Sequence, residues 1–329
     1  MQNMSEPLKN LPQCKICAGE LNTPMQVKEE MFGMGDVFEY AQCKQCECLQ
    51  CLDIPANFAK YYPDNYYSLG PVTGKLSWRE RLKRDLSCKI VLRHPAFMDH
   101  WFKQWAQERN VLEVYHRIGV RPSHSLLDVG CGGGRHVQDL RVAGVKEALG
   151  VDPFIEADVY DDGQLLVKKG SLSDIVGKFD FIAFHHSFEH IEGQQATFDA
   201  AVKLLKPKGK ILIRIPTVTS EAYEIYREKW LQLDAPRHIY LRSHQSIALI
   251  ANKAGMQQID LWCDSAAGQF IFSEQYQQGI ALFDERSYMK NPKDSIFKPE
   301  QIQEYEKRAI ELNKTLRGDQ ICTVFQLPS

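Results

Sequence analysis

The stretch that most constrains this chain is a short apolar run, residues 125–130, that leads directly into Gly130-Cys131-Gly132-Gly133-Gly134. A run compatible with a helix follows at 135–143, a pattern typical of a buried parallel strand that turns sharply into a helix. Glycines at 130, 132 and 134 allow positive φ angles and let a ligand approach the backbone. The first N–H groups of the helix would face that ligand. The turn is not the dinucleotide fingerprint Gly-x-Gly-x-x-Gly, because residue 135 is Arg.

A second predicted strand, residues 147–152, ends in an acidic residue. Asp152 lies 22 positions beyond Gly130. In α/β nucleotide-binding folds, an acid at about this distance accepts hydrogen bonds from ribose hydroxyls. The glycine turn and this acid together are more specific than either alone, and they predict a bound nucleoside.

These features resemble the class I S-adenosylmethionine (SAM)-dependent methyltransferases. The resemblance covers residues 127–134, Asp152, and the segments 179–182, 188–191 and 204–213. It implies that Asp128 and the backbone of Gly130, Gly132 and Gly134 contact the methionine part of SAM, and that Asp152 holds the ribose. Many relatives place an acid against the adenine, where this chain has Ser171 followed by Leu172. That departure leaves the adenine contact open between Ser171, Asp174 and a backbone group.

Strand and helix patterns alternate from residue 125 onward, which indicates a parallel sheet. Strands are predicted at 125–130, 147–152, 165–170, 179–185, 209–215, 256–264 and 321–327, and helices near 135–143, 194–205, 219–231 and 243–254. The fold class is therefore α/β, and the resemblance implies a Rossmann-like seven-stranded methyltransferase sheet whose last strand is antiparallel. A mostly helical insertion is expected at about 266–318, where it would cover the mouth of the active site or form a subunit contact.

Six of the ten cysteines fall before residue 52. Cys14-x-x-Cys17 and Cys43-x-x-Cys46 form two knuckles, the arrangement that structural Zn²⁺ prefers. The 25 residues between them should form a hairpin with Gly33 and Gly35 in its turn. Cys48-x-x-Cys51 has the same spacing and could form the second knuckle instead. A domain this small would need the metal in order to fold.

The predicted domains are a zinc ribbon at 1–60, a tyrosine-rich linker with basic and aromatic helices at 61–120, and a SAM-binding domain at 121–329. The ribbon and the tract at 58–68 resemble bacterial methyltransferases often found in polysaccharide gene clusters. Residues 75–93 predict a helix with a basic face and an apolar face formed by Trp78, Leu82, Leu86 and Ile90, to which Val91 could also belong. The basic face is either solvated or a contact for a phosphorylated substrate or an anionic membrane surface. A further helix is expected at 99–118.

The candidate catalytic residues are three histidines, His185, His186 and His238. His185 and His186 end a predicted strand, where they could face SAM or accept a hydroxyl proton from the acceptor. A metal is not expected among His185, His186 and His190, because alternate side chains leaving a strand point apart. The segment 234–238 resembles the Asp-x-Pro-Arg-His segment of relatives. Its Arg237 could pair with a substrate anion and His238 could be the base, or the segment could be a rigid structural corner.

The net charge of −2 gives no general reason to expect nucleic acid. No apolar run reaches the ~18 residues that a membrane span needs, and residues 1–13 carry no apolar signal region, so the expected location is the cytoplasm. The sequence thus predicts SAM-dependent methyl transfer to a small molecule, with a sugar nucleotide or glycan precursor as the candidate acceptor class, and a structural Zn²⁺. The alternatives are an RNA methyltransferase, a non-catalytic SAM-binding protein and, more weakly, a nicotinamide-dependent oxidoreductase.

Overall fold

The computed structural model describes residues 13–62, 77–93 and 110–328. Its centre is an eight-stranded sheet in the order β11-β12-β9-β8-β4-β5-β7-β6. The parallel part consists of β4 (Ser125–Val129), β5 (Glu147–Asp152), β7 (Gln164–Lys169), β8 (Phe179–His185) and β9 (Leu205–Pro216). The antiparallel edge consists of β11 (Gln257–Cys263) and β12 (Gln320–Gln326). The predicted Rossmann-like methyltransferase sheet is confirmed, with one addition, because the short strand β6 (Val159–Asp161) forms an edge hairpin with β7.

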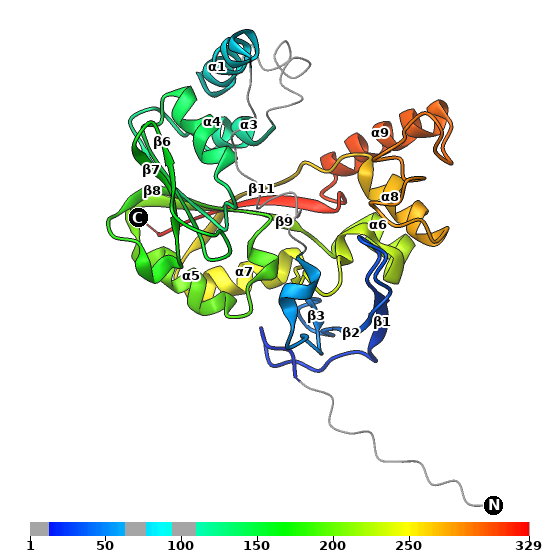
Figure 1. The fold of residues 1–329 in the computed structure, drawn as a ribbon. Coiled ribbons are helices and arrows are strands. Elements are labelled where there is room, and N and C mark those ends of the chain that lie inside the picture. Colours follow the sequence, from blue (N-terminus) through cyan, green and yellow to red (C-terminus); the bar gives the residue numbers. More distant parts are fainter. Residues whose placement is uncertain (1–12, 63–76, 94–109, 329) are drawn as a thin grey trace, which may run out of the picture.

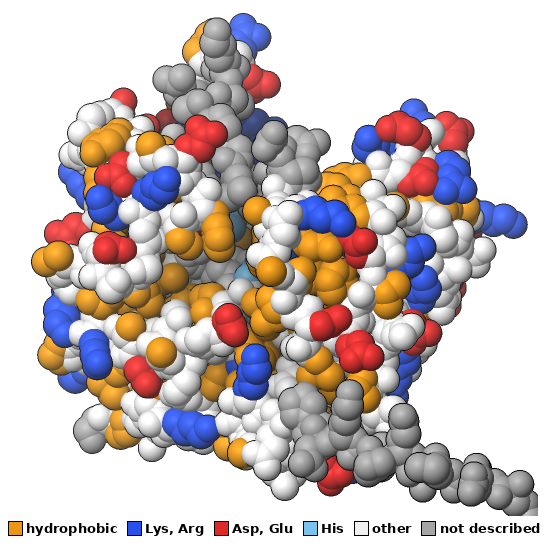
Figure 2. Space-filling view, turned by 60° about the horizontal axis from the view of Figure 1, so that its bottom comes forward, with side chains coloured by type: hydrophobic (Ala, Val, Ile, Leu, Met, Phe, Trp, Pro, Cys, Tyr) orange, Lys and Arg blue, Asp and Glu red, His pale blue; other side chains and the backbone are white. Residues whose placement is uncertain are grey.

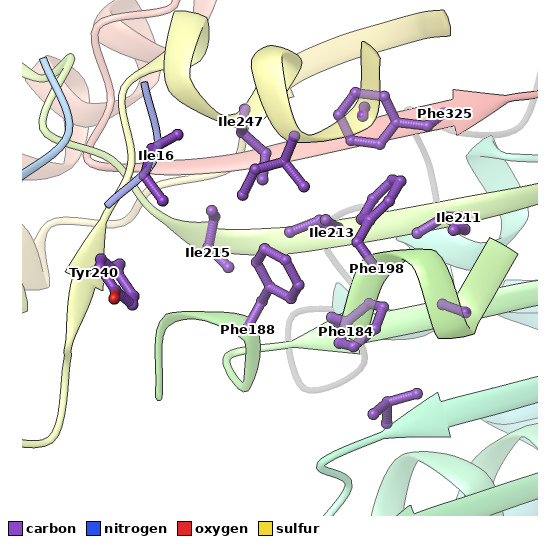
Figure 3. Close-up of a cluster of buried hydrophobic side chains, with 14 of the residues drawn as sticks. Ile16, Phe184, Phe188, Phe198, Ile211, Ile213, Ile215, Tyr240, Ile247 and Phe325 are labelled. Atoms are coloured by element: carbon purple, nitrogen blue, oxygen red, sulfur yellow. The ribbon is translucent and has the colours of Figure 1, made fainter. Parts of the chain in front are cut away.

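Helices cover both faces of this sheet (Figure 1). On one face lie α1 (Trp78–Arg93), α3 (Asn110–Arg117) and α4 (Arg135–Ala143), and on the other lie α5 (Gln194–Lys203) and α7 (His244–Lys253). The helix α7 begins where its sequence predicts, since Ser243 and Ser246 form a reciprocal capping box. Figure 3 shows the core between the sheet and α5/α7, where Phe198 and Ile247 meet Ile213 of β9 and Phe325 of β12. No helix in the described ranges is long and apolar enough to cross a bilayer.

The N-terminal cysteine-rich segment forms a second sheet, in the order β1-β2-β3-β10. Its first three strands are β1 (Met25–Lys28), β2 (Val37–Gln42) and β3 (Leu49–Cys51). The predicted hairpin is confirmed, since β1 and β2 pair antiparallel and Gly33 and Gly35 between them have positive φ angles. The fourth strand, β10 (Tyr240–Leu241), comes from the segment after β9 and pairs with β3. Ile16 packs into the same core as Tyr240 (Figure 3), so the cysteine-rich segment shares its sheet and its core with the larger domain.

The insertion contains two helices, α8 (Gly268–Gln277) and α9 (Pro299–Lys314), with an irregular stretch between them. This layer packs beside α6 (Glu221–Tyr226) and the 3-10 turns η6 (Arg227–Lys229) and η7 (Leu231–Leu233), which together replace the single helix predicted near 219–231. It also contacts the β1–β2 loop, where the N–H of Leu282 donates to the carbonyl of Glu30. The insertion therefore packs against the N-terminal segment of the same chain. This role differs from the two that the sequence suggested, which were covering the active-site mouth and forming a subunit contact.

The apolar face predicted for the basic helix is wrong, except at Val91, which is buried. Trp78, Leu82 and Leu86 of α1 are 70%, 62% and 53% exposed. The helix instead buries Cys88, Val91 and Leu92 against the domain. The regular spacing of apolar residues in the sequence indicates one face of the helix as buried. Packing against α3 and α4 instead buries a different face. Most of the tract at 58–68 and the first part of the helix expected at 99–118 lie outside the described residues.

Candidate active site

The glycine turn between β4 and α4 takes the conformation that its sequence predicts. Gly130 and Gly134 have φ angles of +71° and +85°, and Gly134 directly precedes α4. A Cβ atom on Gly130 would lie 2.4 Å from the Cβ of Ser187, and one on Gly134 would lie 2.4 Å from Val167. The two positions therefore require glycine for backbone conformation and for space. The turn brings its backbone to the carboxyl ends of the parallel strands, where open α/β sheets bind ligands.

Asp152 lies beside this turn, as the sequence predicts. One of its carboxylate oxygens accepts a hydrogen bond from the N–H of Gly132 at 2.8 Å, and the other accepts from the N–H of Phe154 at 2.8 Å. A carboxylate has about four lone-pair positions, so both oxygens can still accept from hydroxyl groups. The acid therefore fixes the turn and retains the capacity to bind a ribose.

Asp128 is a buried carboxyl group directly beneath the turn. It is 1% exposed, and neither of its oxygens has a hydrogen-bond partner among the described residues. Burial, together with the charge of Asp152, raises the pKa of Asp128 to about 8. A buried carboxyl group without a partner is costly, and an ammonium group placed against it would supply the missing charge. This environment fits the amino group of a bound methionine moiety.

The predicted adenine-side residues form a tight turn. Ser171 is exposed, and its N–H and hydroxyl both donate to the carboxylate of Asp174, at 2.8 and 3.1 Å. Leu172 is 8% exposed and begins the 3-10 turn η4 (Leu172–Asp174). Asp174 thus shapes this turn through its bonds to Ser171.

His185 is the last residue of β8 and His186 follows it. The side chains of these two histidines contact different residues. His185 is 7% exposed, its ring lies edge-on to Tyr115 at 5.1 Å, and both ring nitrogens lack hydrogen-bond partners in the described part of the chain. Burial holds the pKa of His185 well below its usual value, so the ring is neutral. His186 bridges Arg214, whose Nη1 lies 3.2 Å from Nε2, and Glu189, whose Oε1 lies 3.5 Å from Nδ1. Because Arg214 can only donate, Nε2 of His186 is already engaged as an acceptor.

The Asp234–His238 segment is a buried structural corner. Arg237 is completely buried, donates to both oxygens of Asp234 and to Glu29 at 2.8 Å, and reaches the carbonyl of Tyr61 at 3.0 Å. The suggestion that Arg237 pairs with a substrate anion is therefore wrong, because its donors are committed inside the protein. The sequence could not reveal this pairing, because Glu29 directly follows β1, more than two hundred residues away from Arg237 in sequence.

The side chain of His238 extends from this corner toward the segment that follows β8. It is 6% exposed, and its Nδ1 lies 2.7 Å from the carbonyl of Gln232, so Nδ1 carries the proton and Nε2 is free to accept. Nε2 lies 3.7 Å from a carboxylate oxygen of Asp234 and 3.9 Å from one of Glu189, which belongs to the 3-10 turn η5 (Phe188–His190). One ring nitrogen of His190 completes a group of three within 4.8 Å of one another. The sequence contains both segments, but only the fold brings them together.

The side chains of four cysteines in the N-terminal segment lie close together. The Sγ atoms of Cys14 and Cys46 are 3.6 Å apart, those of Cys17 and Cys43 are 3.4 Å apart, and all four lie within 4.8 Å of one another. Thiolates bound to one Zn²⁺ at about 2.3 Å lie about 3.8 Å apart, so the spacing suits a tetrahedral metal. Cys48 lies outside this group, and its thiol faces the carbonyl of Leu49 at 3.6 Å. The geometry thus favours the knuckle formed by Cys43 and Cys46.

A surface pocket of about 500 Å³ lies where the cysteine knuckles meet α5 and α7. It is lined by Lys15, Ile16, Glu192, Gly193, Gln194, Gln195, Ala196, Tyr240, Ile250 and Lys253. It contains none of the glycine-turn residues or the candidate histidines, so it is separate from the site described above.

Comparison with known families supports the cofactor assignment. Residues 98–261 match the family model described as a methyltransferase domain. Just under half of the chain thus matches a methyltransferase domain. The match spans the glycine turn, Asp152, the end of β8 and the His238 corner.

A curated relative of this methyltransferase domain is phosphoethanolamine N-methyltransferase 2 from Caenorhabditis elegans. The two are 28% identical over 156 residues, which cover 44% of this chain and 35% of the relative. The aligned region is thus about a third of the relative's length.

Solved structures of SAM-dependent methyltransferases align in part. One from Archaeoglobus fulgidus has 17% identity and a TM-score of 0.43, covering 71% of this chain and 100% of its own. One from Mesorhizobium loti has 14% identity and a TM-score of 0.39, covering 64% and 94%. The fold described here rests on this chain's own strand order.

The environment of Asp128 generates a pH-dependent prediction. With a pKa of about 8, Asp128 is protonated at pH 6.5 in the free protein, whereas an ammonium partner would lower that pKa and release the proton. The affinity for SAM should rise between pH 5.5 and 7, where the α-amino group of SAM is still charged. Calorimetric titration at pH 6.5 in buffers of different ionisation enthalpy should show close to one proton released.

The matched control is Asp128→Asn, which keeps the size of the side chain and removes its titration. It should bind SAM without proton release. Equal proton release by both proteins, or none by the wild type, would contradict a pairing between Asp128 and the amino group.

Proposed function

We propose that this protein transfers the methyl group of SAM to a small-molecule acceptor, of which a sugar nucleotide or glycan precursor is one candidate class. The observation that carries the proposal is the glycine turn held between Asp152 and the unpartnered Asp128. The family match supports the reaction class. The curated relative, whose name gives phosphoethanolamine as its substrate, supports a small acceptor.

The donor side of the site is formed by this chain's backbone and two acids. Bound SAM would supply an electrophilic methyl group. Asp128 would hold the amino group, the backbone from Gly130 to Gly134 would hold the carboxylate end, and Asp152 would hold the ribose. Leu172, Ser171 and the neutral His185 would flank the nucleoside. These contacts fix the orientation of the donor, and an in-line displacement depends chiefly on such positioning.

The acceptor side is formed by the end of β8 and the His238 corner. His186 is engaged by Arg214, which in turn donates to Asp264 at 2.7 Å, so we favour a positioning role for it. His238 keeps Nε2 available, because its Nδ1 proton is held by the carbonyl of Gln232. His238 is therefore the better candidate to act on the nucleophile of the acceptor.

We also propose that Cys14, Cys17, Cys43 and Cys46 hold a structural Zn²⁺. Arg242, immediately after β10, offers a test of fit: it is fully buried, and none of its guanidinium nitrogens has a hydrogen-bond partner among the described residues. Burial lowers the pKa of Arg242, and the nearby charges of Cys48, Tyr240, Cys46 and Cys14 oppose this lowering, which places the cation close to the cysteine cluster. Four thiolates around Zn²⁺ carry a net charge of −2, which would compensate a buried guanidinium.

The cysteine cluster would support the acceptor side mechanically. The hydroxyl of Ser243 donates to the carbonyl of Cys46 at 2.6 Å, and the hydroxyl of Tyr40 donates to the carbonyl of His238 at 2.9 Å. Together with the pair of Arg237 and Glu29, these bonds hold the corner in place. A metal that orders the N-terminal sheet would therefore also order His238.

Replacing His238 with Ala should lower kcat by roughly 10²-fold or more and leave SAM affinity near the wild-type value, since His238 acts on the acceptor. S-adenosylhomocysteine formation would be measured with a panel of sugar nucleotides and phosphorylated amines. His124→Gln is the control, because His124 accepts from the N–H of Arg121 outside the candidate site. Unchanged turnover in His238→Ala would remove His238 from this role. No product with any small molecule, together with steeply salt-dependent RNA binding, would favour the RNA alternative.

Loading the protein with Co²⁺ in place of Zn²⁺ should produce intense thiolate-to-cobalt absorption in the wild type and in Cys48→Ser, but not in Cys46→Ser. Chelation should lower the thermal unfolding midpoint, because metal binding contributes folding free energy. If the absorption is lost in Cys48→Ser and kept in Cys46→Ser, the other knuckle supplies the ligand. If the wild type shows no such absorption, the zinc proposal fails.

A further inference from the structure

Glu189, His190 and His238 form a compact group of potential ligands apart from the cysteine cluster. One ligand atom from each lies within 4.8 Å of the other two. η5 supplies Glu189 and His190, and the corner before β10 supplies His238. The N–H of Ile239 donates to the carbonyl of Glu189 at 2.9 Å, which fixes the two segments side by side.

Both histidines are oriented by backbone carbonyl groups. Nδ1 of His190 lies 2.8 Å from the carbonyl of Arg237, and Nδ1 of His238 lies 2.7 Å from the carbonyl of Gln232. A carbonyl can only accept, so each Nδ1 carries the proton and each Nε2 keeps its lone pair. Histidines that bind metals are usually held in this way, with the second ring nitrogen donating to a carbonyl or carboxylate.

Glu189 is a buried carboxylate that lacks its expected partners. It is 0% exposed, and neither of its oxygens has a hydrogen-bond partner within the described ranges. Its nearest polar neighbours are Nδ1 of His186 at 3.5 Å and Nε2 of His238 at 3.9 Å. Nearly all buried carboxylates are paired or bind metals, so an ion between Glu189 and the two histidines would supply what is missing.

The charges around the group also favour a cation. The single positive charge of Arg237 is already paired with Asp234 and Glu29. Glu189 adds a further negative charge, and its nearest potentially cationic groups among the described residues are the imidazoles of His186 at 3.5 Å and His238 at 3.9 Å. Asp234 itself is committed to Arg237 through both oxygens. Glu189 is thus the carboxylate that remains available as a ligand.

We propose that Glu189, His190 and His238 bind one divalent first-row metal ion. Two imidazoles and one carboxylate form a three-ligand set that leaves coordination positions open, unlike a closed site of four cysteines. Ligand atoms around such an ion lie roughly 3.4 Å apart, so the 3.9 Å between His238 and Glu189 requires only a small closure.

The ion would face the donor site. His190 is half-buried, and the hydroxyl of Tyr62 lies 3.3 Å from its Nδ1. The ring of Tyr62 stacks on Phe154 at 6.2 Å, two residues beyond the proposed ribose ligand Asp152. Figure 2 shows small areas of histidine surface in a hollow near the centre of this face, bordered by hydrophobic side chains. If the proposed function holds, a bound ion would engage Nε2 of His238, so His238 would act on the acceptor through the ion and not by taking a proton itself. The open coordination positions would orient an acceptor oxygen or amine; metal binding itself does not depend on that function.

Mn²⁺ is a suitable probe, because it prefers oxygen and nitrogen ligands and competes poorly for thiolates. The full chain loaded with one equivalent of Zn²⁺, which the four cysteines would bind first, would be titrated with Mn²⁺, and free Mn²⁺ would be followed by electron paramagnetic resonance. One Mn²⁺ per chain should bind. Glu189→Gln and His238→Gln, which keep similar size, should each weaken binding at least tenfold, while His124→Gln should bind as the wild type does.

A second measurement covers the case in which these variants fail to fold. Pulsed electron paramagnetic resonance of wild-type protein with Mn²⁺ should detect coupling to two imidazole nitrogens. Absence of Mn²⁺ binding to the wild type, binding unchanged in both folded variants, or bound Mn²⁺ without imidazole coupling would each overturn the proposal. Because these measurements need neither SAM nor an acceptor, they can fail or succeed independently of methyl transfer.

Discussion

The rest of the site depends on the close approach between the glycine turn and the segment after β8. The hydroxyl of Ser187 donates to the carbonyl of Val129 at 2.6 Å, and the N–H of Gly130 donates to the carbonyl of Val151 at 2.8 Å. These bonds join the ends of β8, β4 and β5 at one point. Any side chain on Gly130 would separate them, because its Cβ would meet Ser187 at 2.4 Å. The acids proposed to hold the donor and the histidines proposed to face the acceptor are thus positioned by the same set of contacts.

The N-terminal sheet takes part in the site, although it contributes none of the proposed catalytic residues. Its strand β3 pairs with β10, its Glu29 neutralises Arg237, and its Tyr40 holds the carbonyl of His238. A buried ion pair gives little net stability by itself, but removing one partner is costly. The proposed acceptor corner therefore depends on the N-terminal sheet being folded, so the cysteine cluster would influence the proposed reaction without taking part in it.

Local patterns predicted the parts of the structure that depend on neighbouring residues. The strand before Gly130, the acid that ends β5, the hairpin at Gly33 and Gly35 and the start of α7 at Ser243 all follow from spacing and turn chemistry. Where long-range contacts decide, the sequence was insufficient. The exposed face of α1 and the committed Arg237 are results of packing against distant segments. The group of Glu189, His190 and His238 was missed because strand alternation was extended past His185, where the chain enters a 3-10 turn instead.

The central claim is that a bare backbone turn beside Asp152 holds a sulfonium nucleoside. Calorimetric titration of SAM into the wild type, Gly130→Ala and Gly163→Ala tests it most directly. Gly163 also has a positive φ angle, +75°, but a Cβ atom there would meet nothing within 4 Å. The account predicts binding by the wild type and by Gly163→Ala, and loss of binding by folded Gly130→Ala. A wild-type protein that binds neither SAM nor S-adenosylhomocysteine, or a Gly130→Ala variant with unchanged affinity, would contradict it.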